Sequence, residues 1–304
     1  VELNERMKKE YENIIMVQEA LHEKKIAQIA ESIKKNKKRI ILIAGPSSSG
    51  KTSFAKRLCI QLQVVGLKPL YLGTDDYFKD RKDMVPDEKG NLDFESLEAV
   101  DLPLFFTQMN ALLAGEKVHL PTFDFVEGVK KYGDREVSID NTQPVVIEGI
   151  HGLNPKMSAG IPDEQKYRIY ISPLTSLNID RHHRIPTTDA RMLRRIVRDE
   201  RTRNNSAEET LKDWSSVRRG EDAYIFPYSY SADMFFNSSC VYELSVLKKY
   251  AKPLLEEIPS DSEVYCEAQR MLDFLKFFKE IPDDSCIVNN SLIREFIGGS
   301  ILVK

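Results

Sequence analysis

The stretch IAGPSSSGKTSFAKRL, residues 43–58, decides how the chain folds. Its centre, GPSSSGKT at 45–52, is a complete G-x-x-x-x-G-K-[ST] match. The run at 39–45 is short, apolar and β-branched, which predicts a buried parallel strand. Residues 51–65 have the pattern of a helix that stops at Gly66. Because the match lies between a strand and a helix, it predicts a phosphate-binding P-loop.

Each part of this loop has a physical role in holding phosphate. Gly45 and Gly50 allow a tight turn in which successive backbone N–H groups point inward, and the helix N-terminus adds partial positive charge. Lys51 reaches the β- and γ-phosphates, and the Thr52 hydroxyl ligates Mg²⁺. We therefore expect the chain to bind ATP and Mg²⁺. The expected ATP-binding residues are Gly45, Pro46, Ser47, Ser48, Ser49, Gly50, Lys51, Thr52 and Ser53.

Further apolar runs alternate with helical patterns along the chain. The expected strands are 69–76, 144–153, 167–173 and 232–239, and the expected helices are 4–35, 95–114, 187–220, 245–257 and 265–279. A charged stretch with proline and glycine, residues 79–94, is expected to be a loop. Strands that alternate with helices predict an α/β fold of the P-loop type, with a mostly parallel sheet flanked by helices.

Composition limits the possible partners and location. The 304 residues are 41% hydrophobic and 30% charged, which is ordinary for a globular protein, and a net charge of −3 argues against a nucleic-acid partner. No apolar run approaches the roughly 20 residues that span a bilayer, and the charged start does not have the pattern of a signal peptide. The cysteines are scattered, so we expect reduced thiols and a cytoplasmic location. They are Cys59, Cys240, Cys266 and Cys286.

Acidic residues follow two of the expected strands. Asp75 and Asp76 end the strand after the P-loop helix. A carboxylate there could orient an acceptor hydroxyl and accept its proton late in phosphoryl transfer, although the same pair could simply begin a turn. Glu148 ends the run VVIE and has the pattern of an acid that holds Mg²⁺ through water. The expected metal-associated residues are thus Thr52 and Glu148.

The segment DARMLRRIVRDERTRNN, residues 189–205, is rich in arginine. Helical spacing places Arg191, Arg195 and Arg198 on one face. An Arg-rich helical lid, at about 187–225, could close over phosphates and exclude water, and an arginine at the transferring phosphoryl group can accelerate the reaction by about 10³–10⁵. A salt-bridged surface helix or an RNA-binding helix are the alternatives.

Two aromatic residues lie close together in PTFDFVEGVKKY, residues 121–132. In an extended segment Phe123 and Phe125 point to the same side, which would suit stacking on a flat base; alternatively both belong to the core. Three histidines form no metal-ligand pattern with the cysteines, and we expect them to be structural. They are His151, His182 and His183.

Five motifs now stand in an order and approximate spacing that resemble the uridine kinase/phosphoribulokinase family. They are GPSSSGKTS, TDDYFKD, PTFDF, VVIEGIHGL and RRIVRDERTR, and together they cover roughly residues 38–240. The chain looks most like a bacterial uridine kinase branch in which the kinase follows a region similar to part of threonyl-tRNA synthetase. The helix at 4–35 looks like the tail of such a longer protein, and the ending LIREFIGGS is also similar to that branch.

The resemblance implies roles for particular residues. Asp75 matches the general base, Asp93 the acid that holds the ribose hydroxyls, and Glu148 the Mg²⁺-associated acid. The implied catalytic residues are Asp75, Lys51, Arg198 and Arg203. The implied substrate-binding residues are Asp75, Asp93, Phe123, Phe125, Arg195 and Arg198.

The sequence departs from the family pattern at two positions. Gly128 stands where uridine kinases carry a histidine that reads the pyrimidine edge, and Asn205 replaces a second lid arginine. A site that loses a polar partner discriminates less between substrates. The expected function is ATP-dependent phosphorylation of the 5′-hydroxyl of uridine or cytidine. The alternatives are a kinase of another nucleoside, pentose or small alcohol, and an ATP-sensing or RNA-binding module without kinase activity.

The expected organisation has three parts. Residues 1–37 form an N-terminal helical extension, residues 38–258 the P-loop kinase domain, and residues 259–304 a C-terminal helical extension. The expected partner is a small-molecule acceptor, with no membrane; a homo-oligomer is expected from the resemblance alone. The start at Val1 rather than Met adds to the expectation of an upstream region.

Overall fold

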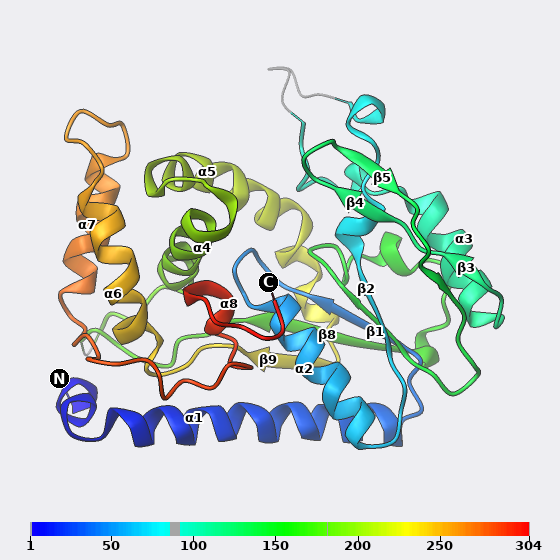
Figure 1. Ribbon diagram of the computed structural model, residues 1–304, viewed down its shortest axis with the longest axis horizontal. Helices are drawn as coiled ribbons and strands as arrows, with labels where there is room; N and C mark the ends of the chain where they lie inside the picture. The colour runs from blue at the N-terminus through cyan, green and yellow to red at the C-terminus, as the bar shows by residue number, and fades with distance from the viewer. Residues whose placement is uncertain (1, 86–91, 181, 304) are drawn as a thin grey trace.

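A five-stranded parallel sheet organises the protein. The computed structural model describes residues 2–85, 92–180 and 182–303. All five predicted strands form this sheet, which confirms the α/β fold (Figure 1). In spatial order the strands are β2 (Leu70–Gly73), β7 (Val145–Glu148), β1 (Ile40–Ala44), β8 (Lys166–Ser172) and β9 (Met234–Asn237).

The central strand β1 is buried on both faces because helices cover both sides of the sheet. Successive side chains of a strand point to opposite faces. Ile40 and Leu42 therefore join a core with α3 (Leu102–Leu113). Ile41 and Ile43 join a second core with α2 (Lys51–Val64).

The long helix α1 (Glu2–Lys35) is kinked at Glu10, and its longer part lies along the base of the molecule (Figure 1). Its second half buries Ile29 and Ile33 in the core shared with α2 and the sheet. Its first half buries Ile14 and Ile15 against the helices that stand beside the sheet. The predicted extension at 1–37 thus contributes to two cores, while its status as a separate unit stays a prediction.

Five helices stand beside the sheet. They are α4 (Thr187–Arg203), α5 (Ala207–Tyr224), α6 (Glu243–Glu256), α7 (Tyr265–Leu275) and α8 (Arg294–Ile297). The predicted helical stretch at 187–220 is divided because Asn204 adopts left-handed backbone, φ 52°, and ends α4. Ser206 and Glu209 then form a capping box that starts α5.

Other local differences from the prediction have physical causes. The helix predicted at 95–114 begins only at Leu102, because the Asp101 carboxylate accepts a hydrogen bond from the Leu104 N–H at 3.2 Å and caps it there. Two small antiparallel pairs were not predicted: β3 (Val118–His119) with β6 (Glu136–Val137), and β4 (Thr122–Asp124) with β5 (Val129–Lys131). Within the predicted loop at 79–94, residues 86–91 lie outside the described residues.

The strand register brings the ends of three strands together. Glu148 at the end of β7 pairs with Ile43 of β1 on one side and with Gly73 of β2 on the other. The P-loop follows β1 directly, and a 3₁₀ turn (Thr74–Tyr77) follows β2. Ligands of open α/β sheets bind at this carboxyl edge. Among the described helices, none combines the length and apolar character needed to cross a bilayer.

We expect Ile33→Ala to lower the free energy of unfolding by about 2–5 kcal/mol, because Ile33 is fully buried between α2 and the sheet. Val17 of the same helix is 61% exposed, so Val17→Ala is the matched control and should change it by less than about 0.5 kcal/mol. Urea unfolding measures both. Equal effects, or separate unfolding of α1, would contradict a shared core.

Candidate active site

A cleft of about 520 Å³ opens at the carboxyl edge of the sheet. Residues 47–52 of the P-loop line it, together with Asp75 and Glu148. The predicted ATP-binding residues Gly45, Pro46 and Ser53 do not line it. The structure thus brings most of the predicted phosphate-binding loop and two of the three predicted strand-end acids, Asp75 and Glu148, into one cavity.

The P-loop has the shape that its sequence requires. A Cβ on Gly45 would lie 2.0 Å from the Ile171 carbonyl oxygen, so only glycine fits beside β8. The Lys51 side chain folds back onto the loop, and its ammonium group donates to the carbonyl oxygens of Gly45, at 3.0 Å, and Pro46, at 3.2 Å. Its positive charge is therefore held at the mouth of the loop.

A buried ion pair fixes the tip of the P-loop. The Arg191 guanidinium of α4 pairs with the Glu221 carboxylate of α5, and both side chains are almost completely buried. Arg191 also donates to the Ser47 carbonyl oxygen at 3.1 Å, while the Ser47 N–H donates to Glu221 at 3.1 Å. Helical spacing grouped Arg191 with Arg195 and Arg198, but Arg191 does not line the cleft. Its role in this structure is to hold the loop backbone.

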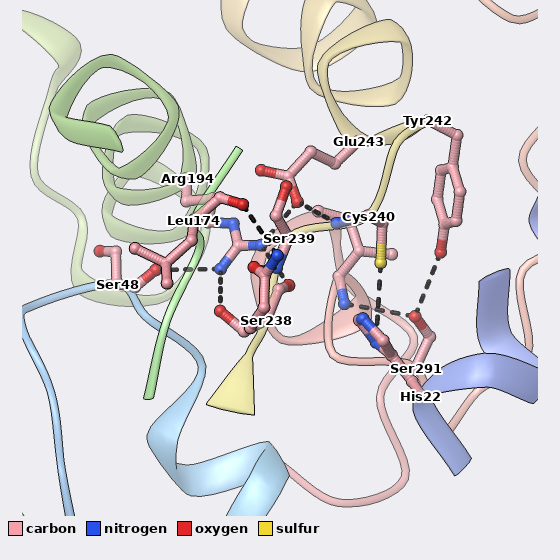
Figure 2. Close-up of polar contacts among 12 residues, drawn as sticks. His22, Ser48, Leu174, Arg194, Ser238, Ser239, Cys240, Tyr242, Glu243 and Ser291 are labelled. Atoms are coloured by element: carbon pink, nitrogen blue, oxygen red, sulfur yellow. Dashed lines mark hydrogen bonds and ion pairs between the residues drawn. The ribbon is translucent and has the colours of Figure 1, made fainter. Parts of the chain in front are cut away.

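A second buried pair holds the next residue of the loop. Figure 2 shows Arg194 of α4 between Ser48, Ser238 and Glu243. Its guanidinium donates to the Ser48 carbonyl oxygen at 3.3 Å and to the Glu243 carboxylate at 2.7 Å. Sequence reasoning missed this contact because an arginine on a helix gives no sign of which way it points.

Three other arginines of α4 line the cleft: Arg195, Arg198 and Arg203. The Asp199 carboxylate, 1% exposed, lies 3.2 Å, 2.6 Å and 3.5 Å from their nearest guanidinium nitrogens, respectively. Arg195 also donates to the Ser47 hydroxyl at 2.9 Å. A single buried acid thus gathers three positive charges beside the P-loop, where an anionic ligand would neutralise them.

Glu148 and Thr52 meet at the floor of the cleft. The Thr52 hydroxyl donates to Glu148 Oε1 at 2.9 Å, and the Tyr71 hydroxyl donates to the same oxygen at 3.0 Å. Burial, together with the nearby Asp75 carboxylate, raises the pKa of Glu148 to about 7. A cation bound beside Glu148 would stabilise the ionised carboxylate and so lower this pKa again.

A hydroxyl and a carboxylate oxygen are suitable neighbours for Mg²⁺, which keeps several waters and shares its ligands with phosphates. No cluster of three or more His, Cys, Asp or Glu residues that could hold a metal occurs in the part of the chain that the structure describes. Thr52 and Glu148 therefore fit a magnesium ion that arrives with a nucleotide, rather than a site formed by protein ligands alone.

The structure separates the two neighbouring aspartates. Asp75 lines the cleft. Burial of its carboxyl group raises its pKa, Lys51 lowers it, and the nearby acids Asp76 and Glu95 raise it further. Asp76 points elsewhere: its carboxylate accepts from the Phe123 N–H at 3.4 Å and lies 3.7 Å from Arg135. Only Asp75 can therefore meet a ligand in the cleft.

An aromatic wall forms part of the lining of the cleft. It consists of Phe78, Phe94 and Phe125. The ring of Phe78 lies 5.4 Å from that of Phe94 and 6.3 Å from that of Phe125. Phe123, expected to line a base pocket, is instead buried behind the wall, with its ring 5.1 Å from Phe125. Sequence reasoning missed Phe78 and Phe94, although Phe78 lies within the motif TDDYFKD and Phe94 directly follows the candidate residue Asp93.

The structure gives further detail on Asp93, its neighbour Glu95 and Gly128. Asp93 does not line the cleft; its carboxylate accepts from the Glu95 N–H at 3.0 Å and stabilises a turn. Glu95 does line it, and burial raises the pKa of Glu95 while Arg195 and Lys51 lower it. At Gly128, φ is 73° and a Cβ would lie 2.3 Å from the Arg81 side chain. Arg81 thus occupies the space in which a side chain at position 128 would start.

The fold and the cleft together define a P-loop phosphotransferase. The chain belongs to the phosphoribulokinase/uridine kinase family, whose model matches residues 40–245. It is therefore an enzyme that transfers a phosphoryl group to an alcohol, and its family implies the use of ATP.

Individual relatives show the extent of the similarity. The chain is 28% identical over 193 residues to a uridine kinase of Halobacterium salinarum, covering 63% of this chain and 76% of that protein. It is 28% identical over 196 residues to a uridine kinase of Staphylococcus aureus, covering 64% and 85%. Among solved structures it is similar to a D-glycerate 3-kinase of Cryptococcus neoformans, with 13% identity, a TM-score of 0.49 and coverage of 66% and 87%.

We expect the raised pKa of Glu148 to make stability depend on pH. The folded protein keeps this proton to about pH 7, whereas an unfolded glutamate loses it near 4.5. The stability from protonated Glu148 is therefore complete below pH 4.5 and lost as pH rises through 7. Relative to Glu148→Gln, the wild-type free energy of unfolding should fall by about 3 kcal/mol across this range.

Urea unfolding in buffer without magnesium or nucleotide measures this difference. Titrating groups far from Glu148 contribute equally to both proteins and cancel, whereas the interacting Asp75 carboxylate contributes to the measured difference. Parallel pH profiles for the wild type and Glu148→Gln would contradict the burial of an uncompensated carboxyl group.

Proposed function

We propose that the protein transfers the γ-phosphoryl group of ATP, with Mg²⁺, to the 5′-hydroxyl of a pyrimidine nucleoside such as uridine or cytidine. One observation carries the proposal: Asp75 lines the same cleft as the phosphate-binding loop and an aromatic wall. The names of the relatives support the choice of acceptor.

The phosphate end of the cleft supplies positive charge and backbone donors. Lys51 would leave its two carbonyl partners and contact the transferring phosphoryl group. Arg198 and Arg203 would neutralise the charge that spreads over this group in a loose transition state. Thr52 and Glu148 would hold Mg²⁺, which when bound would offset negative charge on the phosphates.

At the acceptor end, Asp75 would position the nucleoside hydroxyl. An alcohol is too weak an acid to be deprotonated beforehand, so Asp75 would orient the hydroxyl in line with the γ-phosphate and accept its proton late in the transfer. The base would stack on Phe125, which is 56% exposed at the cleft. Arg195 is placed to contact either the nucleoside or a phosphate. The role of Asp93 as a ribose ligand stays a prediction.

A different acceptor is the second candidate, and Gly128 favours it. Position 128 has no side chain to read a pyrimidine edge, and the Arg81 side chain lies where one would start. Another nucleoside, a pentose or a small alcohol would use the same phosphate machinery, since the roles proposed for Lys51, Asp75 and Arg203 concern the phosphoryl group and the acceptor hydroxyl. Asn205, the other departure, lies just after α4. Its backbone N–H donates to the Asp199 carbonyl oxygen, and its side-chain amide donates to the Thr210 hydroxyl of α5.

We expect Asp75→Asn to reduce turnover by about 10²–10⁴, because the amide cannot accept the acceptor's proton. Affinity for ATP should change by no more than about twofold. The measurement is ATP consumption with magnesium against nucleosides, pentoses and sugar phosphates, with both proteins side by side.

Turnover of uridine or cytidine, lost in the variant, would support the proposal, and turnover of another acceptor alone would overturn the substrate. Tight ATP binding without any turnover would instead favour an ATP-sensing module. Activity retained in Asp75→Asn would contradict the role of this carboxylate.

We expect Phe125→Ala to raise KM for the nucleoside by about tenfold or more, because stacking of a base on an aromatic ring is worth about 1–3 kcal/mol. KM for ATP should stay unchanged. Tyr132 is a similarly exposed aromatic residue outside the cleft, so Tyr132→Ala is the control. Steady-state kinetics with each substrate varied in turn measure the two KM values separately. A KM for the nucleoside that is equal in Phe125→Ala and the wild type would exclude stacking of the base on Phe125.

A further inference from the structure

The C-terminal segment reaches the phosphate-binding loop from the opposite end of the sequence. Leu292 is fully buried in the core that α2 shares with the sheet, and lies against Gly50 of the P-loop. Helix α8 lies beside α4 and near the start of α2 (Figure 1). Phe296 of α8 is buried, and the Arg194 guanidinium lies over its ring, with the Arg194 Cζ 5.0 Å from the ring centre. The segment is thus part of the walls of the nucleotide site.

One side chain of this segment binds the first turn of α2. The Glu295 carboxylate accepts from the Ser53 hydroxyl at 2.6 Å and from the Ser53 N–H at 3.3 Å. Ser53 is completely buried, and Glu295 is 8% exposed and lines the cleft. The carboxylate therefore lies at the boundary between the helix end and the cavity.

The Ser53 N–H is one of the donors that a helix leaves without an intrahelical partner. Gly50 is the N-cap of α2, and the Phe54 N–H is the first to bond back to it, at 3.0 Å. Free N–H groups here, with the positive end of the helix dipole, are what a P-loop offers to phosphate. In this structure a carboxylate of the chain itself takes one of them. The α-phosphate of a bound nucleotide would compete with this carboxylate for the same N–H donors.

The backbone that carries Glu295 is held independently of this contact. Arg201 donates to the carbonyl oxygens of Glu295, at 2.9 Å, and Phe296, at 3.2 Å. Figure 2 shows Ser291 in contact with Tyr242. Ser291 also donates to the buried Glu19 carboxylate of α1 at 2.7 Å. The segment can therefore stay in place while the Glu295 side chain alone turns into the cleft.

We propose that Glu295 is an affinity-determining residue of the nucleotide site: its carboxylate occupies the α2 donors that the α-phosphate takes, and nucleotide binding displaces it. This inference rests on the proposed use of ATP. The exchange replaces one charge-assisted hydrogen-bond pair by another, so the chain binds nucleotide less tightly than its P-loop alone would allow.

Titration calorimetry with ADP tests the inference, using the full chain. Glu295→Gln keeps the shape but removes the charge, and Glu295→Ala removes the contact. Both should bind ADP more tightly, Glu295→Ala by about tenfold, as for loss of one charge-assisted competitor. Glu280→Gln removes the same charge from an exposed position outside the cleft and should match the wild type. Unchanged or weaker binding by Glu295 variants with wild-type thermal unfolding overturns the inference.

A crystal structure of the wild type with ADP keeps the inference testable if the variants do not fold. The expected result is a phosphate oxygen on Ser53 and the Glu295 carboxylate turned away; a carboxylate still on Ser53 overturns it. Tighter ADP binding without turnover of any acceptor would overturn the proposed function only. Turnover of a nucleoside with equal ADP affinities would overturn this inference only, and no ADP binding by any variant would overturn both.

Discussion

Two buried arginine–carboxylate pairs hold the phosphate-binding loop, and both come from helices beside the sheet. Arg191 with Glu221 fixes the two backbone groups of Ser47, and Arg194 with Glu243 fixes the carbonyl group of Ser48. Such pairs add little net stability, because burying two charges offsets most of their attraction. Loss of one partner, however, leaves an uncompensated charge in the core. These pairs therefore determine where the loop lies more than how stable the protein is.

The same region carries an unusual balance of charge. Four carboxylates line the cleft: Asp75, Glu95, Glu148 and Glu295. Against them stand Lys51 and three arginines of α4 that Asp199 gathers. The raised pKa values of Asp75, Glu95 and Glu148 follow from this crowding in a poorly solvated cavity. A nucleotide with its magnesium ion would change the balance at both ends of the cleft at once.

Much of the fold could be predicted because its strands are buried on both faces. Continuous apolar runs such as RIILIAG and PVVIEGI identify such strands without any knowledge of their neighbours. The small antiparallel pairs were missed because strands of two or three residues leave no periodic pattern. The start of α3 was missed because a cap at Asp101 outweighed the helical pattern before it. Phe123 was expected to line a base pocket, with the core as the alternative, and it is buried against Phe78, because residue spacing alone does not distinguish a pocket residue from a core residue.

The sequence by itself determined the P-loop, the class of sheet that carries it and the family of enzymes to which the chain belongs. These depend on local patterns, in which a few neighbouring residues suffice. Only the tertiary structure decided that Asp75 rather than Asp76 meets the cleft, and which arginines of α4 face the ligand and which hold the loop. It also placed Glu295 on Ser53, 242 residues away. Such contacts arise where packed helices and strand ends converge, and no local pattern encodes that geometry.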